Sequence, residues 1–283
     1  MAIKIIREIK TINNTVSDLK KQGKRIGFVP TMGALHKGHI SLVENSKKEN
    51  DITVVSIFVN PTQFNNKTDL KKYPRNEKQD TRMLENAGCD YVFAPSVNEM
   101  YPKNETQKTF DFGQLATVME GKHRPGHFDG VGQIVYKLFK AVCPDNAYFG
   151  IKDFQQLAII NYMVKNYMPD SGIKITGCDI VREADGLAMS SRNERLSENQ
   201  RKSAGMINQI MKKYHSQASN NDIEKIKSSI IYEINEIDHL KVEYYDIVNN
   251  ETLQPTEKAD SNARGCIAVF CDDVRLIDNM PFS

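Results

Sequence analysis

Apolar residues in the first two thirds of the chain alternate between two patterns. Short runs rich in β-branched residues, such as residues 52–59, are typical of strands that are buried on both faces. Longer polar segments carry apolar residues at helical spacing, as in residues 76–87, where Gly88 follows as a C-terminal cap. The same patterns predict further strands at residues 26–29, 91–94, 147–150 and 173–181, and further helices at residues 38–48, 132–142 and 153–165. This alternation favours the α/β class, with a doubly wound, Rossmann-type parallel sheet.

The pattern changes after Arg192. Ser197 and Gln200 have the spacing of a capping box, which predicts a long amphipathic helix from that point. A polar break at residues 217–221 separates it from a second helix, in which isoleucines recur at three- and four-residue spacing. Strands are predicted at residues 242–248, 265–270 and 274–277. We therefore expect a Rossmann-type domain over residues 1–177 and a smaller α+β domain over residues 178–283.

The composition is that of an ordinary globular protein. The 283 residues are 40% hydrophobic and 26% charged, and the net charge of +2 leaves no basic surplus for a nucleic-acid partner. The five cysteines are odd in number and lack a Cys-x-x-Cys pair, which argues against a disulfide framework and a zinc ribbon. Early charges and short apolar runs argue against a signal peptide and a membrane span. We expect a cytoplasmic protein with no nucleic-acid or membrane partner.

Candidate chemistry begins where the strand at residues 26–29 meets the helix at residues 38–48. In a parallel sheet this junction lies at the carboxyl ends of the strands, where nucleotides bind and where the helix N-terminus offers free N–H groups to phosphate. His36 and His39, three residues apart, would point the same way. Gly33 and Gly38 would leave room for a base or phosphate to approach. The stretch predicts a phosphate-binding turn, with a pair of surface histidines or half of a metal site as the alternatives.

A second strand-to-helix junction has the same character. Lys152 follows the predicted strand at residues 147–150 and can serve as a point charge for phosphate oxygens. Asp153 can cap the following helix or bind the ribose hydroxyls, and Gln156 would face the same side one turn later. A plain helix cap beside a surface lysine is the alternative.

Two polar loops add further candidates. Ser190 and Ser191 supply hydroxyl groups, and Arg192 supplies a fork of donors suited to phosphate, in a loop that could close over a nucleotide. The alternative is a polar loop between domains. Gln63 and Asn60 follow the strand at residues 52–59, where the Gln63 amide could orient a small polar substrate while Asn60 caps a turn. The loop at residues 121–128 could border a pocket.

Four blocks of sequence, at residues 30–39, 58–64, 150–153 and 182–193, together resemble the pantoate–β-alanine ligase family. The His-x-Gly-His element alone marks only a wider superfamily of nucleotidyltransferases and class I tRNA synthetases, but the four blocks span essentially the whole chain. The resemblance implies an ATP-dependent condensation of (R)-pantoate with β-alanine through a pantoyl-adenylate, with release of pyrophosphate and AMP. It also implies Mg²⁺ as cofactor, a homodimer, and a first domain that binds ATP and pantoate beneath a second domain that closes over ATP.

The same resemblance implies roles for individual residues. The catalytic set would be His39, His36, Lys152, Ser190, Ser191 and Arg192. The ATP site would comprise Met32, Gly33, Ala34, Leu35, His36, Lys37, Gly38, His39, Gly150, Ile151, Lys152, Asp153, Val181, Met189, Ser190, Ser191 and Arg192. Gln63, Gln156 and Asn60 would bind the substrates. Separately from the resemblance, Asp80, which follows the loop at residues 73–75, is a candidate magnesium ligand, although Gln79 stands where an adjacent carboxylate would help. The family commonly has Glu where this chain has Ile151, and we expect a small effect because the neighbouring residues match.

Two other functions remain open at this point. Another His-x-Gly-His nucleotidyltransferase of cofactor biosynthesis would join a nucleotide to a phosphorylated second substrate instead of releasing AMP. A non-catalytic ATP-sensing module would bind the nucleotide without turnover, although three clusters of catalytic type would then be idle.

Overall fold

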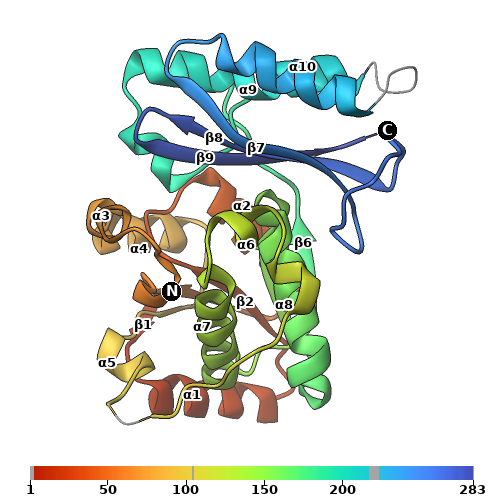
Figure 1. Ribbon diagram of the computed structural model, residues 1–283. Helices are drawn as coiled ribbons and strands as arrows, with labels where there is room; N and C mark the ends of the chain where they lie inside the picture. Colours follow the sequence, from red (N-terminus) through yellow and green to blue (C-terminus); the bar gives the residue numbers. More distant parts are fainter. Residues whose placement is uncertain (1–2, 104, 217–222, 283) are drawn as a thin grey trace.

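The computed structural model describes residues 3–103, 105–216 and 223–282. The chain folds into a parallel sheet with helices on both faces, followed by a smaller antiparallel sheet that two helices cover (Figure 1). Helices α9 and α10 lie on the side of the smaller sheet that faces away from the first sheet (Figure 1). The α/β prediction with a smaller α+β part is therefore confirmed.

The larger sheet has six parallel strands in the order β1-β4-β3-β2-β5-β6. Their bounds are β1 Lys4–Ile6, β2 Ile26–Thr31, β3 Ile52–Ile57, β4 Tyr91–Phe93, β5 Asn146–Gly150 and β6 Lys174–Cys178. After β2 the chain adds β3 and β4 on one side of the sheet, and after β5 it adds β6 on the other side. In a sheet of this kind, ligands bind at the carboxyl ends of the two strands where the order reverses. The topology therefore places a site between the ends of β2 and β5.

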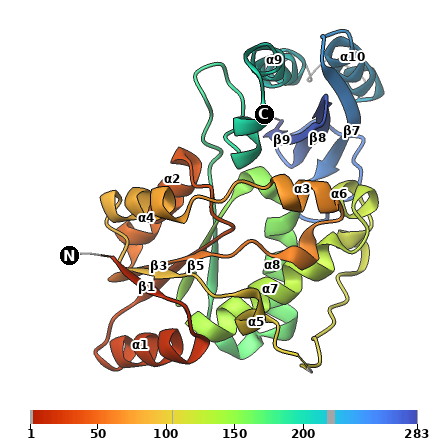
Figure 2. The same ribbon diagram turned by 90° about the vertical axis from the view of Figure 1, so that its left-hand side faces the viewer.

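Helices bury both faces of this sheet (Figures 1 and 2). Phe28 and Val54 belong to an apolar core that α1, α7 and α8 share, whereas their neighbours Val29 and Val55 belong to a core that α2 and α4 share. Burial on both faces explains why the strands read as continuous apolar runs. The bounds are α1 Ile9–Lys21, α2 Lys37–Glu49, α4 Glu77–Asn86, α7 His127–Val142 and α8 Phe154–Tyr167, with short helices α3 Lys67–Lys72, α5 Val97–Met100 and α6 Met119–His123.

The C-terminal unit consists of α9 Glu198–His215, α10 Ile223–Asn235 and the antiparallel strands β7 Leu240–Asn249, β8 Ala263–Cys271 and β9 Val274–Pro281. The predicted capping box opens α9, because the Gln200 N–H donates to Ser197 Oγ and the Ser197 N–H donates to Gln200 Oε1. Ile226 and Ile230 of α10 are buried in a core of their own with the sheet. This unit therefore has its own apolar centre.

Some element bounds differ from the predictions. The strand predicted to end at residue 59 ends at Ile57, and the helix predicted from residue 132 begins at His127, after Gly126 adopts a left-handed conformation. Part of the predicted loop at residues 121–128 is helical, and neither β1 nor α1 was predicted. The predicted break at residues 217–221 lies outside the described residues, and the domain boundary at residue 178 stays a prediction. Within the described ranges, no helix is long and apolar enough to cross a membrane.

His215 shows how the smaller core holds a buried polar group. Its Nδ1 lies 3.2 Å from the Pro281 carbonyl oxygen, its Nε2 lies 2.7 Å from the Tyr245 hydroxyl oxygen, and its ring stacks on Phe282. The neutral ring satisfies both contacts, with Nδ1–H donating to the carbonyl and Nε2 accepting from the hydroxyl. Burial lowers the pKa of His215 to about 4; the hydrogen bond to the Pro281 carbonyl opposes this effect, and the charge of Arg264 adds to it.

This lowered pKa predicts a loss of stability in acid. Below its ordinary pKa near 6.5 the unfolded chain protonates His215 while the folded chain does not, so the free energy of unfolding falls as the pH drops from 7 towards 4. Between pH 6 and 5 we expect His215 to contribute about 1 kcal/mol per pH unit to that slope. Urea unfolding at pH 7, 6 and 5 should show a shallower slope for His215→Phe, which keeps the stacking but cannot titrate. An unchanged slope would contradict this account.

Candidate active site

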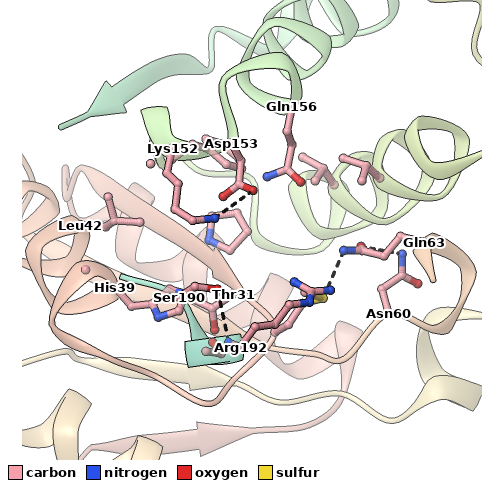
Figure 3. Close-up of a pocket in the computed structure, with 18 of the residues that line it drawn as sticks. Thr31, His39, Leu42, Asn60, Gln63, Lys152, Asp153, Gln156, Ser190 and Arg192 are labelled. Atoms are coloured by element: carbon pink, nitrogen blue, oxygen red, sulfur yellow. Dashed lines mark hydrogen bonds and ion pairs between the residues drawn. The ribbon is translucent and has the colours of Figure 1, made fainter. Parts of the chain in front are cut away.

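A cavity opens at the carboxyl ends of β2 and β5, where the strand order reverses (Figure 3). The side chains of Lys152 and Gln156 point into the same space as those of Gln63 and Arg192 (Figure 3). These four residues come from three segments that are far apart in the sequence, since Lys152 and Gln156 are neighbours.

Most of the predicted site residues line this cavity. They are Met32, His36, Gly38, His39, Asn60, Gln63, Gly150, Lys152, Asp153, Gln156, Val181, Met189, Ser190, Ser191 and Arg192. The remaining predicted residues, Gly33, Ala34, Leu35, Lys37, Ile151 and Asp80, do not line it. The structure therefore brings the four sequence blocks together, although their roles stay predictions.

His36 and His39 form the N-terminal cap of α2. The Gly38 N–H donates to His36 Nδ1 at 3.2 Å, and the His36 N–H donates to His39 Nδ1 at 3.3 Å. Gly38 is needed because a Cβ atom there would lie 2.9 Å from the His36 ring, so the glycine makes room for a side chain of the protein itself. Because each Nδ1 accepts a hydrogen bond, the proton of each neutral ring is on Nε2.

Both histidines are neutral at pH 7. Burial and then the charge of Lys152 lower the pKa of His36 to about 4, against a smaller opposing effect of Asp153. Burial, followed by His36 and Lys152, holds the pKa of His39 well below its ordinary value. The two rings therefore offer Nε2–H donors, and an approaching anion would favour their charged forms.

The turn before α2 is held from two sides. Gly33 and Ala34 both have left-handed backbone conformations, with φ of 79° and 51°. The carboxylate of Asp80 accepts hydrogen bonds from the backbone N–H groups of Ala34 and Leu35, at 2.9 and 2.7 Å. Ser191 Oγ donates to the Ala34 carbonyl at 2.9 Å. Asp80 thus organises the turn from outside the cavity, and its role as a magnesium ligand stays a prediction that these contacts do not favour.

The segment after β5 is held by the last strand of the chain. Asn279 of β9 donates through Nδ2 to the carbonyl groups of Ile151 and Lys152, both at 2.9 Å. The Ile151 side chain faces β6, because a Cβ atom at Gly177 would lie 3.1 Å from Ile151 Cγ1. The departure from the usual Glu therefore lies outside the cavity lining. Lys152 lines the cavity with its Nζ 3.7 Å from Asp153 Oδ1.

Gln63 and Asn60 form one polar wall of the cavity. Asn60 Nδ2 donates to Gln63 Oε1 at 3.0 Å and to the Gly130 carbonyl at 3.1 Å, which fixes the Gln63 amide. His127 Nδ1 lies 2.9 Å from the Gln63 carbonyl oxygen, and Arg124 also donates to that oxygen. Arg124 and His127 line the cavity as well. Their basic motif was predicted only to border a pocket.

The cavity also has an apolar wall. It was not predicted as part of the site, because its residues have the helical spacing of ordinary core positions. It is formed by Phe58 and Phe149 at two strand ends and by Val131, Ile134, Val135 and Leu138 of α7. A ligand with both polar and branched apolar parts fits such a lining.

The cavity also offers carboxylates for a nucleotide-bound cation. Asp153 and Asp179 line it, although the described residues contain no group of three or more metal-binding side chains. Mg²⁺ is typically held by one or two carboxylates together with substrate phosphates. The donor set therefore fits a magnesium ion that arrives with a nucleotide.

Comparisons with known proteins agree with this site. The family model of pantoate-beta-alanine ligase matches residues 4–281. The chain is 52% identical to the pantothenate synthetase of Bacteroides fragilis (strain YCH46) and 47% identical to that of Porphyromonas gingivalis (strain ATCC BAA-308 / W83), in each case over 99% of both chains.

Solved structures give the same result. The pantothenate synthetase of Thermus thermophilus superposes with a TM-score of 0.92 at 36% identity, over 99% of both chains. The pantoate-beta-alanine ligase of Francisella tularensis, in complex with beta-gamma ATP and beta-alanine, superposes with a TM-score of 0.83 at 37% identity, over 99% of this chain and 98% of that one. The sequence matches and these structures show that the chain belongs to the pantoate–β-alanine ligase family.

Proposed function

We propose that this protein uses ATP to join (R)-pantoate to β-alanine through a pantoyl-adenylate, releasing pyrophosphate and then AMP. The observation that carries the proposal is the cavity between β2 and β5. It gathers hydrogen-bond donors and positive charges suited to phosphate beside a wall that has a polar part and an apolar part. Pantoate has a carboxylate, hydroxyl groups and a branched apolar centre, which match that wall. Family membership and the ATP-complexed relative support the same assignment.

In the first step, the pantoate carboxylate attacks the α-phosphorus of ATP, and negative charge moves onto the leaving pyrophosphate. The Nε2–H groups of His36 and His39 and the charges of Lys152 and Arg192, which all line the cavity, would stabilise that charge. Hydrogen bonds hold the two histidines and Arg192 before the reaction, so these groups need little reorganisation. Magnesium bound to the ATP phosphates, near Asp153 and Asp179, would neutralise part of their charge.

In the second step, the β-alanine amine attacks the acyl carbon of the adenylate. The new C–N bond forms as the bond from that carbon to the AMP oxygen breaks. Arg124 and His127, beside the Gln63 carbonyl, are the cavity groups available to orient the second substrate. The apolar wall of α7 excludes water from the adenylate and so limits its hydrolysis. The cytoplasmic location and the homodimer implied by the resemblance stay predictions.

The reaction predicts a specific order of products. With ATP, Mg²⁺ and pantoate alone, we expect about one equivalent of pyrophosphate per site, because the adenylate stays bound. Continuous release of AMP should require β-alanine, and both products can be followed by chromatography. Turnover with a nucleotide and a phosphorylated second substrate would instead indicate a nucleotidyltransferase. ATP binding without pyrophosphate release from any acid would indicate a sensing module.

The tautomer of His39 predicts different effects for two substitutions. In His39→Asn the side-chain oxygen can replace Nδ1 as the acceptor in the α2 cap, but the Nε2–H donor is lost. We expect this variant to fold normally and to lose about 10²-fold in the rate of the pyrophosphate burst.

His39→Gln is the matched variant, because its amide N–H₂ lies near the position of Nε2. It should keep more of the burst rate than His39→Asn, as measured by rapid quench. If the burst were faster in His39→Asn than in His39→Gln, the reaction would depend on the α2 cap and not on the Nε2–H donor.

The role of Asp80 can be separated from metal binding. Asp80→Asn replaces one of two acceptors with an N–H₂ group that faces a backbone N–H, so the turn before α2 loses its support. We expect kcat/KM for ATP to fall about tenfold, with no recovery at high Mg²⁺. Glu77→Gln on the same helix, where Glu77 pairs with Arg7 at the surface, is the control. Recovery of Asp80→Asn by Mg²⁺ would show that Asp80 is a metal ligand after all.

A further inference from the structure

An ion-pair cluster borders the cavity beside Arg192. Asp69 of α3 uses one carboxylate oxygen for each of two arginines: Oδ2 lies 2.7 Å from Arg192 and Oδ1 lies 3.0 Å from Arg195. Arg195 also forms an ion pair with Asp273, between β8 and β9, at 2.9 Å. Lys72 of α3 pairs with the same carboxylate at 3.0 Å. The cluster therefore ties α3 to the loop after Ser190 and to the C-terminal unit.

The two arginines differ in what they face. Arg192 lines the cavity, whereas Arg195 does not. Within the described part of the chain, Asp69 is the hydrogen-bond partner of the Arg192 guanidinium, through one terminal nitrogen. The other terminal nitrogen and Nε keep their donors for a ligand. The Arg192 guanidinium also lies over the Tyr73 ring at 5.8 Å, which limits its motion from a second side.

Both members of the pair are partly buried and charged. Burial raises the pKa of Asp69, but the hydrogen bond and charge of Arg192 and the charge of Arg195 outweigh that effect and leave the pKa below its ordinary value. Burial lowers the pKa of Arg192, but the hydrogen bond and charge of Asp69, together with Tyr73 and Asp153, outweigh that effect and leave the pKa above its ordinary value. A long arginine side chain at a cavity edge would otherwise sample many rotamers. The ion pair therefore fixes the guanidinium in the folded protein. The side-chain entropy is lost on folding, so ligand binding does not have to order this side chain.

We propose that Asp69 is a positioning residue, which holds the Arg192 guanidinium at the cavity edge so that its free donors meet the phosphates of ATP. This inference rests on the proposed function, because it needs a nucleotide in the cavity. It gives α3 a role in the reaction, although no side chain of α3 lines the cavity. The opposite possibility is that Asp69 withholds Arg192 from the nucleotide and competes with it.

Asp273 provides a matched control. Asp69→Asn and Asp273→Asn each remove one carboxylate partner of Arg195, but only the first removes the partner of Arg192. We expect Asp69→Asn to raise KM for ATP about tenfold and to slow the pyrophosphate burst, since a displaced binding group weakens the reacting geometry. Asp273→Asn should leave both unchanged. Asp69→Glu, which keeps the charge, should recover part of the loss.

A double substitution distinguishes positioning from general destabilisation. In an Arg192→Gln background, adding Asp69→Asn should change KM for ATP by less than about twofold, because there is no guanidinium left to position. An equal effect in both backgrounds would overturn the inference. So would a lower KM for ATP in Asp69→Asn, since that is the result expected if Asp69 withholds Arg192. An inactive wild-type protein would overturn the proposed function as well, whereas an active one with an unaffected Asp69→Asn variant would overturn this inference alone.

Discussion

The reversal of strand order between β2 and β5 is the constraint on which the site depends. The carboxyl ends of parallel strands lie at the same edge of a sheet. After β2 and β5 the chain leads to neighbouring strands on opposite sides, so no connection crosses the space between the two strand ends. The turn with His36 and His39 follows β2, and the segment with Lys152 follows β5. Two short segments separated by more than a hundred residues thus present their donors to one volume, because strand pairing of β2 with β5 fixes the distance between them.

The electrostatic character of this volume follows from burial. His36 and His39 lie close to each other and to Lys152, and both have pKa values well below their ordinary range. Without a ligand the two rings are therefore uncharged hydrogen-bond donors, and Lys152 and Arg192 supply the positive charge. An anionic ligand changes this balance, because its charge favours protonated imidazole. The site thus gains positive character when phosphate enters, and it avoids four adjacent cations when phosphate is absent.

The sequence predicts the features that are local and misses those that depend on distant contacts. The two strand-to-helix junctions could be found because strand, glycine and donor are adjacent in the chain. Asp69 could not be assigned to Arg192, which lies 123 residues away, nor Asn279 to the Lys152 carbonyl, 127 residues away. Asp80 was a candidate magnesium ligand from its place after the loop at residues 73–75, but its partners are backbone N–H groups of a turn 45 and 46 residues earlier.

The contacts between the two parts of the chain show why the site needs both. Ser191 holds the turn after β2 through the Ala34 carbonyl, and Asn279 holds the segment after β5 through the Lys152 carbonyl. Away from the cavity, Arg275 of β9 donates to both oxygens of the buried Glu120 of α6, at 2.8 and 2.7 Å. Separating a buried pair of this kind leaves an uncompensated charge, which is strongly unfavourable. The Glu120–Arg275 pair therefore favours one docked arrangement, and that arrangement sets the positions of the segments that carry His36, His39 and Lys152. A displacement of the C-terminal unit would move the donors of the site even if no residue in the cavity changed.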